Sequence, residues 1–429
     1  MAAYTCMAND ADGTNKMSQQ QRVVITGTGI VSSIGCDETS VWESLLAGRS
    51  GLRKVSRFDA SENRVQHGAE VDPAALDGLQ SGKLLRADLT VRFAVEAARQ
   101  ALLGAELELS PETTRERQIA SIWGSACGQA GTLFEARARF SDRGPRGLRP
   151  STVPKVMSNA TSAEVSMQFG LTGTNQVVVS ACTSATNAIG QAFRMIRHGE
   201  IDAALCGGSD AFFDPFYFGV WNNLGVLSPI EDPAAAVRPF DANRQGTLLG
   251  EGAGALMLES LESAQRRGAP IRGELLGYGE SSDATHITNP SVDGQRLAIE
   301  NALRSAAVDP IEIGYVNAHG TATLTNDVTE SRSIRAALGD VATDGLVVGA
   351  NKSYLGHTLG ASGALESVIT VAALERRLAP PNLNLDEPDP ECQVPLVGRT
   401  AQPLEKVVAM KNSFGFGGGN GVLIFRRFS

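Results

Sequence analysis

Cys182 is the residue of this chain best placed to act as a nucleophile. It lies in the segment VVVSACTSATNAIGQAFRMIRHG, directly after the β-branched run 177–179, which predicts a buried strand. Apolar residues recur at helical spacing after the cysteine, and His198 and Gly199 are typical of a helix end. A cysteine at such a turn directs its sulfur at a helix N-terminus, whose dipole favours the thiolate. The pattern indicates a nucleophile elbow, although a buried structural cysteine would give the same local sequence.

Two of the five histidines stand where they could assist a thiol. His319 follows the strand-like run 313–317 in IGYVNAHGTATLTND, and His357 lies in GANKSYLGHTLGASG with Lys352 five residues earlier. A surface histidine usually lies among polar residues and a core histidine on an apolar helical face, and neither description fits these small-residue turns. One cysteine and two histidines on three strand–loop junctions predict a thiol active site.

The elements that would position these residues fall into two similar halves. Strands are predicted at 23–26, 119–123, 177–180, 203–206 and 254–259, and again at 273–277, 314–317, 346–349, 407–411 and 421–425. The strand–turn–helix unit around Cys182 matches the one around His357, whose helix is expected over about 362–377. Two such halves predict two mixed sheets packed on shared helices.

Composition excludes several classes of protein. The chain has 429 residues, 42% hydrophobic content and a net charge of −9, which fits a well-packed α/β protein and makes nucleic acid an unsuitable partner. We expect no membrane span, no bound metal and no disulfide framework, since apolar runs are short and six cysteines are scattered. Residues 1–20 read as a disordered tail without a signal peptide, and Met17 is a possible alternative start. The expected location is the cytoplasm.

Eight ordered motifs carry a resemblance to a known family. They are VVITGTGIVSSIG, SACTSATNAIG, RPFDANRQGTLLGEGAGALMLE, GYGESSDATHIT, YVNAHGTATLTND, GANKSYLGHTLGASG, PPNLNLDEPDPEC and NSFGFGGGNGVLIF. From Arg22 to Phe428 the chain resembles the elongating type II β-ketoacyl-acyl carrier protein synthases of the thiolase superfamily. The resemblance implies an α/β, thiolase-like five-layer αβαβα fold of two pseudo-repeated halves. The N-terminal half, 21–270, would carry the nucleophile, and the C-terminal half, 271–429, the histidines.

The same resemblance implies a role for each site residue. Cys182 would hold an acyl group as a thioester, and the backbone N–H groups of Cys182 and Phe416 would form an oxyanion hole. His319 and His357 would be neutral imidazoles that donate hydrogen bonds to an enolate formed by decarboxylation of a malonyl thioester. Lys352 would pair with Glu330. Three threonines are expected to contact the phosphopantetheine arm: Thr321, Thr323 and Thr288. The position of Thr288 is equally well explained by turn chemistry. No permanently bound cofactor is expected.

Several residues depart from the family pattern near the expected site. RQGT replaces the common RDGF, which puts Gln245 and Thr247 in place of an acid and an aromatic residue. Cys127 and Trp221 stand where a bulkier aliphatic residue and a phenylalanine commonly line the acyl pocket. HGTAT carries Ala322 where the family has serine or glycine, and GFGGGN carries Gly419 where the family has threonine. The catalytic set is intact, so these departures predict altered substrate scope.

We therefore expect decarboxylative condensation of an acyl group on Cys182 with malonyl-acyl carrier protein. The alternative pathway is a type II polyketide or polyene assembly line, in which the chain pairs with a cysteine-less chain-length partner; otherwise a homodimer is expected. A non-catalytic chain-length subunit would not retain Cys182 and both histidines, and a thiolase acting on coenzyme A would carry a cysteine in the final Gly-rich loop. The expected docking patch for the acidic carrier protein is Lys83 and Arg86, with Arg92 and Arg64 nearby in the sequence.

Overall fold

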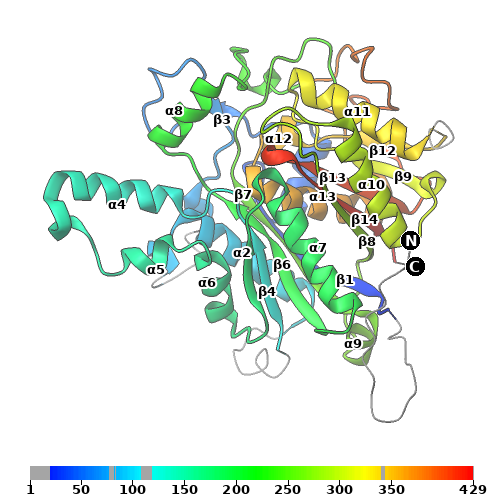
Figure 1. Cartoon of the computed structure of the whole chain (residues 1–429), viewed down its shortest axis with the longest axis horizontal. Helices are drawn as coiled ribbons and strands as arrows, with labels where there is room; N and C mark the ends of the chain where they lie inside the picture. Colours follow the sequence, from blue (N-terminus) through cyan, green and yellow to red (C-terminus); the bar gives the residue numbers. More distant parts are fainter. Residues whose placement is uncertain (1–19, 77–81, 83, 108–117, 340–343, 429) are drawn as a thin grey trace.

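The computed structural model describes residues 20–76, 82, 84–107, 118–339 and 344–428 (Figure 1). The predicted N-terminal tail, apart from Gln20, lies outside the described residues, and so does Lys83. Among the described residues, none of the helices combines the length and apolar character that crossing a membrane requires.

One ten-stranded sheet organises the chain. Its strands, in hydrogen-bonded order, are β10 (Val347–Gly349), β9 (Ile313–Asn317), β13 (Val408–Phe414), β14 (Gly419–Arg426), β8 (Gly273–Ser282), β1 (Val23–Val31), β7 (Gly252–Ser260), β6 (Ala203–Asp210), β4 (Ala120–Gly124) and β5 (Asn175–Val178). Two small ribbons pair β2 (Arg53–Lys54) with β3 (His67–Gly68) and β11 (Leu378–Ala379) with β12 (Gln402–Pro403).

The sheet consists of two halves with the same topology. In each half the first strand in the sequence pairs antiparallel with the last one. The last strand pairs antiparallel with the next strand toward the sheet edge, and two further strands continue in parallel to that edge. The predicted pair of sheets is therefore present, but the two are joined because β1 also pairs with β8 over residues 23–25 and 273–275. The fold class of two pseudo-repeated halves is confirmed.

Helices lie between and outside the two half-sheets (Figure 1). The helices are α1 (Glu38–Leu46), α2 (Leu89–Gly104), α4 (Ala130–Arg143), α5 (Thr152–Val156), α6 (Ala160–Phe169), α7 (Ser184–Arg197), α8 (Pro215–Leu224), α9 (Leu261–Arg266), α10 (Val292–Ala306), α11 (Leu324–Leu338), α12 (Lys352–Leu355) and α13 (Ser362–Arg376). Apolar residues of α7 and α13 form one core with both half-sheets, α2 and α6 cover the outer face of the N-terminal half, and α10 and α11 that of the C-terminal half. These are the five layers of the expected fold.

The central helix α7 packs closely against α13 and against β6, because a glycine lies at each contact. A Cβ on Gly363 in α13 would lie 2.2 Å from Thr186 Oγ1 in α7, and a Cβ on Gly208 in β6 would lie 2.5 Å from the Ala185 methyl carbon. Real side chains do not approach so closely, so glycine sets the spacing of this layer. The N-termini of α7 and α13 are thereby held next to each other.

One predicted strand differs in its environment. The run 177–179 was expected to be buried, but β5 is the last strand of the sheet and its residues are half-buried or exposed. Val179 has 62% of its surface exposed. A β-branched run has the same sequence pattern in a central strand and in an edge strand, so the pattern cannot distinguish the two.

Candidate active site

Cys182 stands at a strained turn between β5 and α7. The preceding residue, Ala181, has a φ of 51°, a left-handed conformation that costs a non-glycine residue about 1–2 kcal/mol. Hydrogen bonds hold the turn: Ser180 N donates to Ser184 Oγ at 2.9 Å, and Ser184 Oγ donates to Ala181 O at 2.7 Å. The turn continues through η4 (Ala181–Thr183) into the helix, and the Cys182 side chain is buried. This is the predicted elbow geometry.

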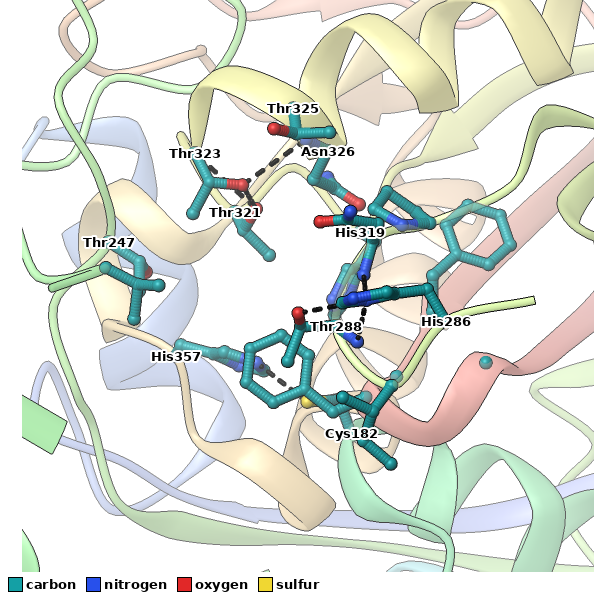
Figure 2. A pocket seen from close by; sticks show the side chains of 18 of the residues that line it. Cys182, Thr247, His286, Thr288, His319, Thr321, Thr323, Thr325, Asn326 and His357 are labelled. Atoms are coloured by element: carbon teal, nitrogen blue, oxygen red, sulfur yellow. Dashed lines mark hydrogen bonds between the residues drawn. The ribbon is translucent and has the colours of Figure 1, made fainter. Parts of the chain in front are cut away.

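His357 contacts the thiol directly. Its Nε2 lies 3.1 Å from Cys182 Sγ (Figure 2). Its Nδ1 lies 3.1 Å from Ser362 Oγ. The backbone N–H of His357 donates to Leu248 O at 2.7 Å, which ties this loop to the N-terminal half. Burial lowers the pKa of His357 well below its ordinary value, and the charges of Lys352 and Lys411 lower it further. The imidazole is therefore neutral at neutral pH.

His319 approaches the thiol from the end of β9. Its ring centroid lies 5.3 Å from that of His357, at an interplanar angle of 82°. The backbone N–H groups of His319 and Gly320 donate to the two carboxylate oxygens of Glu330, each at 2.8 Å. Burial also lowers the pKa of His319 well below its ordinary value, with smaller contributions from Lys352, His357 and Lys411.

The predicted pair of Lys352 and Glu330 is wrong, because Lys352 pairs with another glutamate. Its Nζ donates to Glu366 Oε1 at 2.7 Å and to His319 O at 2.5 Å, and it lies 3.3 Å from His319 Nδ1. Glu330 instead anchors the loop of His319 and accepts a hydrogen bond from Asn412 Nδ2 at 3.2 Å. The actual partner, Glu366, lies within the apolar pattern of α13, where a buried carboxylate has no distinctive sequence signal.

A second buried lysine belongs to the same cluster and was not predicted. Lys411 Nζ in β13 lies 2.8 Å from Glu366 Oε2, so one carboxylate is shared by two ammonium groups. All three side chains are almost fully inaccessible to solvent. Lys411 directly precedes the motif NSFGFGGGN, and a lysine before a glycine-rich loop reads in the sequence as an ordinary surface residue.

The resting thiol is protonated, contrary to the expectation from its helix N-terminus. Burial raises the pKa of Cys182 to about 11, which outweighs the lowering effects of Lys352 and of the backbone N–H groups of Phe416 and Cys182. Those two N–H groups are close enough to the sulfur to lower its pKa, and they are the pair expected to form the oxyanion hole. Their effect is too small to overcome desolvation of the thiolate.

The pocket leading to the thiol has a polar entrance. Thr321 and Thr323 share a hydrogen bond of 2.8 Å between their hydroxyls, and Thr288 lies beside His286, with 3.3 Å between Thr288 Oγ1 and His286 Nδ1 (Figure 2). The residues lining this pocket include Cys182, His319, His357, Thr288, Thr321, Thr323, Thr247, Trp221 and Phe416. The structure thus brings the predicted arm-binding threonines to the same opening as the predicted catalytic groups.

Cys127 lies behind this lining. Its sulfur is 2.8 Å from the Tyr217 hydroxyl, and burial raises its pKa well above the ordinary value. Cys127 packs in the same apolar cluster as Cys182, but it is not among the residues lining the pocket. Trp221 stacks on Phe416 with ring centroids 6.1 Å apart and an interplanar angle of 12°. Both aromatic rings line the pocket, whereas Cys127 contacts Tyr217.

The proposed carrier-protein patch is only partly available in the structure. Arg86 and Arg64 are exposed, and the Arg64 guanidinium donates to Leu227 O at 3.4 Å, next to the pocket-lining Val226. Arg92 is buried and cannot contribute to a surface patch. Its guanidinium donates to Pro73 O at 3.4 Å, which the helical charge pattern did not indicate.

Asp210 is a further residue that the sequence did not identify. This buried carboxylate at the end of β6 accepts hydrogen bonds from Ser125 Oγ at 2.6 Å, Ala126 N at 2.9 Å and Gly360 N at 2.8 Å. It therefore links a loop of the N-terminal half to the turn that follows His357. Burial raises its pKa to about 6.

The arrangement suits thiol chemistry better than metal chemistry. Among the described residues, Cys182, His319 and His357 form the one cluster whose ligand atoms, all within 4.8 Å of one another, could surround an ion. The ammonium groups of Lys352 and Lys411 lie in the same buried site and would repel a divalent cation. We therefore interpret the cluster as a nucleophile with two proton-handling imidazoles.

Comparison with known proteins agrees with this geometry. Residues 20–264 match the family profile described as the N-terminal domain of beta-ketoacyl synthase, and residues 272–386 match its C-terminal domain. The chain is 40% identical over 414 residues to the 3-oxoacyl-[acyl-carrier-protein] synthase 2 of Synechocystis sp., covering 96% of this chain and 99% of that protein.

Two solved structures are similar over the same extent. The ishigamide ketosynthase/chain length factor has a TM-score of 0.88 at 36% identity, and the alignment covers 96% of this chain and all of that one. A type II PKS ketosynthase bound to the hexaketide, solved in complex with its acyl-carrier protein, has a TM-score of 0.87 at 30% identity, with 96% and 100% covered. The chain belongs to the β-ketoacyl synthase family and is an acyltransferase.

The raised pKa of Cys182 gives a testable pH dependence. Because the thiol is mostly protonated below its pKa of about 11, the rate of alkylation by iodoacetamide should rise roughly tenfold per pH unit from pH 6.5 to 9. Peptide mapping after brief labelling measures this rate, and Cys206, whose pKa burial also raises, should remain unlabelled as an internal control. A rate that is already level at neutral pH would mean that the thiol rests as a thiolate paired with an imidazolium, and would contradict our interpretation.

Proposed function

We propose that this β-ketoacyl synthase condenses an acyl group held on Cys182 with a malonyl thioester, releases carbon dioxide, and forms a β-ketoacyl thioester on acyl carrier protein. The observation that carries the proposal is the contact of a buried thiol with a neutral imidazole, His357, while a second neutral imidazole, His319, faces the same pocket. Both substrates would be carried on phosphopantetheine, for which the threonines of the entrance offer hydroxyl partners.

The first step is transfer of the acyl group to the thiol. A protonated thiol is a weak nucleophile, so it needs a base, and His357 Nε2 is the group within reach at 3.1 Å. His357 takes the proton as sulfur attacks the thioester carbonyl, and it returns that proton to the departing carrier thiolate. The N–H groups of Cys182 and Phe416 are placed to hold the carbonyl oxygen when it becomes negative.

The second step needs hydrogen-bond donors to an enolate oxygen. Lys352 can only donate, so His319 Nδ1, 3.3 Å from its ammonium, must accept and His319 Nε2 must carry the proton. His357 can present its Nε2 proton as well, because the Ser362 hydroxyl can either donate to or accept from Nδ1. Loss of carbon dioxide from the malonyl group then leaves a carbanion that attacks the acyl carbonyl on Cys182. Collapse of that intermediate releases the Cys182 thiolate, which takes one proton from solvent, because decarboxylation of the malonyl carboxylate supplies none.

This mechanism changes the division of labour that the sequence suggested, in which neither histidine took part in acyl transfer. His319→Ala should still form acyl-Cys182 at a rate within a few-fold of the wild type, but should lose roughly 10²–10³ in malonyl decarboxylation. His357→Ala should lose both reactions. Intact-mass spectrometry with acyl carrier protein measures the first reaction, and carbon dioxide release from malonyl carrier protein measures the second.

His198→Ala is the matched control, since His198 is exposed at the end of α7. Full acylation of the His357 variant would show that His357 is not the base in acyl transfer. Loss of acylation in the His319 variant would show that the two imidazoles do not act separately.

A second candidate pathway is synthesis of a polyketide or polyene chain. The observation that favours it is the changed lining of the pocket: Thr247, in place of an aromatic residue, is buried and lines the pocket, and Trp221, in place of a phenylalanine, is stacked on Phe416 beside it. The structural similarity to the ketosynthase/chain length factor points the same way.

Thr247→Phe should narrow the range of acyl groups that the enzyme accepts, because a phenyl ring would occupy space that the pocket now leaves open. Competition between acyl carrier proteins of several chain lengths and degrees of unsaturation measures the preference, and Thr247→Val controls for loss of the hydroxyl alone. An unchanged profile in the phenylalanine variant would show that Thr247 does not set substrate scope.

The enzyme is further proposed to work as a dimer in a reducing, cytoplasmic environment, with the acyl carrier protein docking near Arg64 and Arg86. Support for the dimer comes from the open edge of β5 and from the projecting arm of α4 and α5 (Figure 1). Exposed apolar side chains on and next to these elements are Leu133, Phe140, Leu148, Val153, Met157 and Val179. An unpaired edge strand and a cluster of such residues usually mark a protein interface. Five described cysteines are free thiols, as expected in a reducing compartment.

Val179→Lys should convert the purified dimer to a monomer, because it places a charge on the open edge. Native mass spectrometry measures the assembly, and Ile311→Lys is the control, since Ile311 is an exposed β-branched residue of the other half, with 47% of its surface exposed. A wild-type chain that is monomeric alone and dimeric only with a co-expressed paralogue would identify the heterodimer. A wild-type chain that stays monomeric in both cases would contradict the proposed interface.

A further inference from the structure

Lys411 is fully buried, yet it does not line the substrate pocket. It lies in β13, paired with Asn317 of β9 and Leu423 of β14, so the strand fixes its direction. Its Nζ lies 2.8 Å from Glu366 Oε2 and 3.2 Å from Ser413 Oγ, and it also contacts Asn412 O. A lysine is rarely fully buried unless it is paired, because removing the charge from water is costly.

The ionisable groups around Lys411 come from every element packed against it. Two carboxylates, Glu366 of α13 and Glu330 of α11, face two ammonium groups, those of Lys411 and of Lys352 in α12. Tyr315 of β9 stays protonated, because burial raises its pKa far above neutral pH. The remaining titratable neighbours are the neutral His319 and His357 and the thiol of Cys182. With Lys352, Lys411, Glu330 and Glu366 all ionised, the cluster carries two positive and two negative charges, and the neighbouring carboxylate of Asp327 faces the Arg244 guanidinium at 3.8 Å.

We propose that Lys411 is a positioning residue for the decarboxylation step: by sharing Glu366 with Lys352, it holds the Lys352 ammonium against His319 and keeps both imidazoles uncharged. The proposal rests on the function proposed above, in which His319 donates its Nε2 proton to the enolate. Lys411 is not among the residues that line the pocket, so it acts on the imidazoles from outside, through Glu366 and Lys352 and through its own charge.

Removal of Lys411 leaves the cluster with a surplus of negative charge. Glu366 Oε2 would lose its partner, and Glu366 with Glu330 would then outnumber Lys352. A surplus negative charge in a buried site favours protonation of the nearest neutral base. Protonated His319 would present an Nδ1–H to the Lys352 ammonium 3.3 Å away, and two donors in that position repel each other. The imidazole would then leave the orientation in which Nε2 points to the substrate.

Lys411→Met is the direct test, because methionine keeps most of the side-chain volume and removes the charge. The acid limb of the pH–rate profile for malonyl decarboxylation should move to higher pH by roughly one unit. At neutral pH kcat should fall roughly tenfold to a hundredfold. KM should stay unchanged, because Lys411 does not line the pocket.

Imidazole NMR gives a readout that requires no substrate. With histidine labelled at Cε1, the five histidines of the chain can be followed from pH 5.5 to 8. His319 and His357 should not titrate in this range in the wild type and should begin to titrate in Lys411→Met. A shift in NMR without any decarboxylation in the wild type would refute the proposed function but not the electrostatic role of Lys411. Unchanged imidazole titration together with normal decarboxylation would overturn the inference alone.

Two further variants separate positioning from stability. Lys411→Met/Glu366→Gln restores the balance, with Lys352 against Glu330, so the acid limb should return toward its wild-type position even though kcat stays low. Lys406→Met is the control, because Lys406 lies outside the cluster, where its Nζ contacts Asp344 O. If Lys411→Met only lowers the melting temperature, or if the double variant keeps the shifted pH profile, the residue is structural and the proposal is wrong.

Discussion

The buried carboxylate of Glu366 is the interaction on which the arrangement of this active site depends. It holds two ammonium groups, Lys352 at 2.7 Å and Lys411 at 2.8 Å, inside a protein core where a single unpaired charge would be strongly destabilising. Lys352 in turn contacts both the backbone oxygen and the ring of His319. The orientation of an imidazole in the pocket thus follows from an ion pair that no substrate touches.

Burial also sets the protonation of the reacting groups. The same desolvation that raises the pKa of Cys182 to about 11 lowers the pKa values of both histidines, so thiol and imidazoles all rest in their neutral forms. A neutral pair avoids the cost of separated charges in the resting enzyme, and charge develops only when a substrate carbonyl arrives. The backbone N–H groups of Cys182 and Phe416 are fixed beforehand by the elbow and by the glycine-rich loop, in which Gly417 and Gly418 have φ values of 83° and 76°. These donors need no rearrangement during the reaction.

The sequence predicts the scaffold and the reacting side chains better than their supporting contacts. Cys182, His319 and His357 stand at strand–loop junctions, and such positions are readable because periodicity ends there and small residues begin. The partner of Lys352 was assigned to Glu330, because the choice between two buried glutamates depends on which helix face meets the lysine. Lys411 and Glu366 were missed for the same reason: each lies inside a regular element and looks like any other position of it. Asp210 was missed at the end of β6, because its hydrogen-bond partners come from loops distant in the sequence. The effect of burial on Cys182 was also misjudged, because desolvation is a property of the assembled core and not of the local turn.

The two halves of the chain share one more feature, and it shows why only one of the two similar turns can carry a nucleophile. The turn before α13 repeats the elbow before α7: Leu359 has a φ of 46° where Ala181 has 51°, and Gly360 occupies the place of Cys182. A side chain at Gly360 would meet Ala126 N at 2.3 Å, so no nucleophile fits there. Its N–H instead donates to the carboxylate of Asp210 at 2.8 Å. The second elbow thus holds a carboxylate of the protein itself, in the position where the first elbow is proposed to receive the oxyanion of a substrate. The contact between Gly360 and Asp210 joins the two halves of the chain, so the repeated turn serves in one half as the proposed reaction centre and in the other as a structural link.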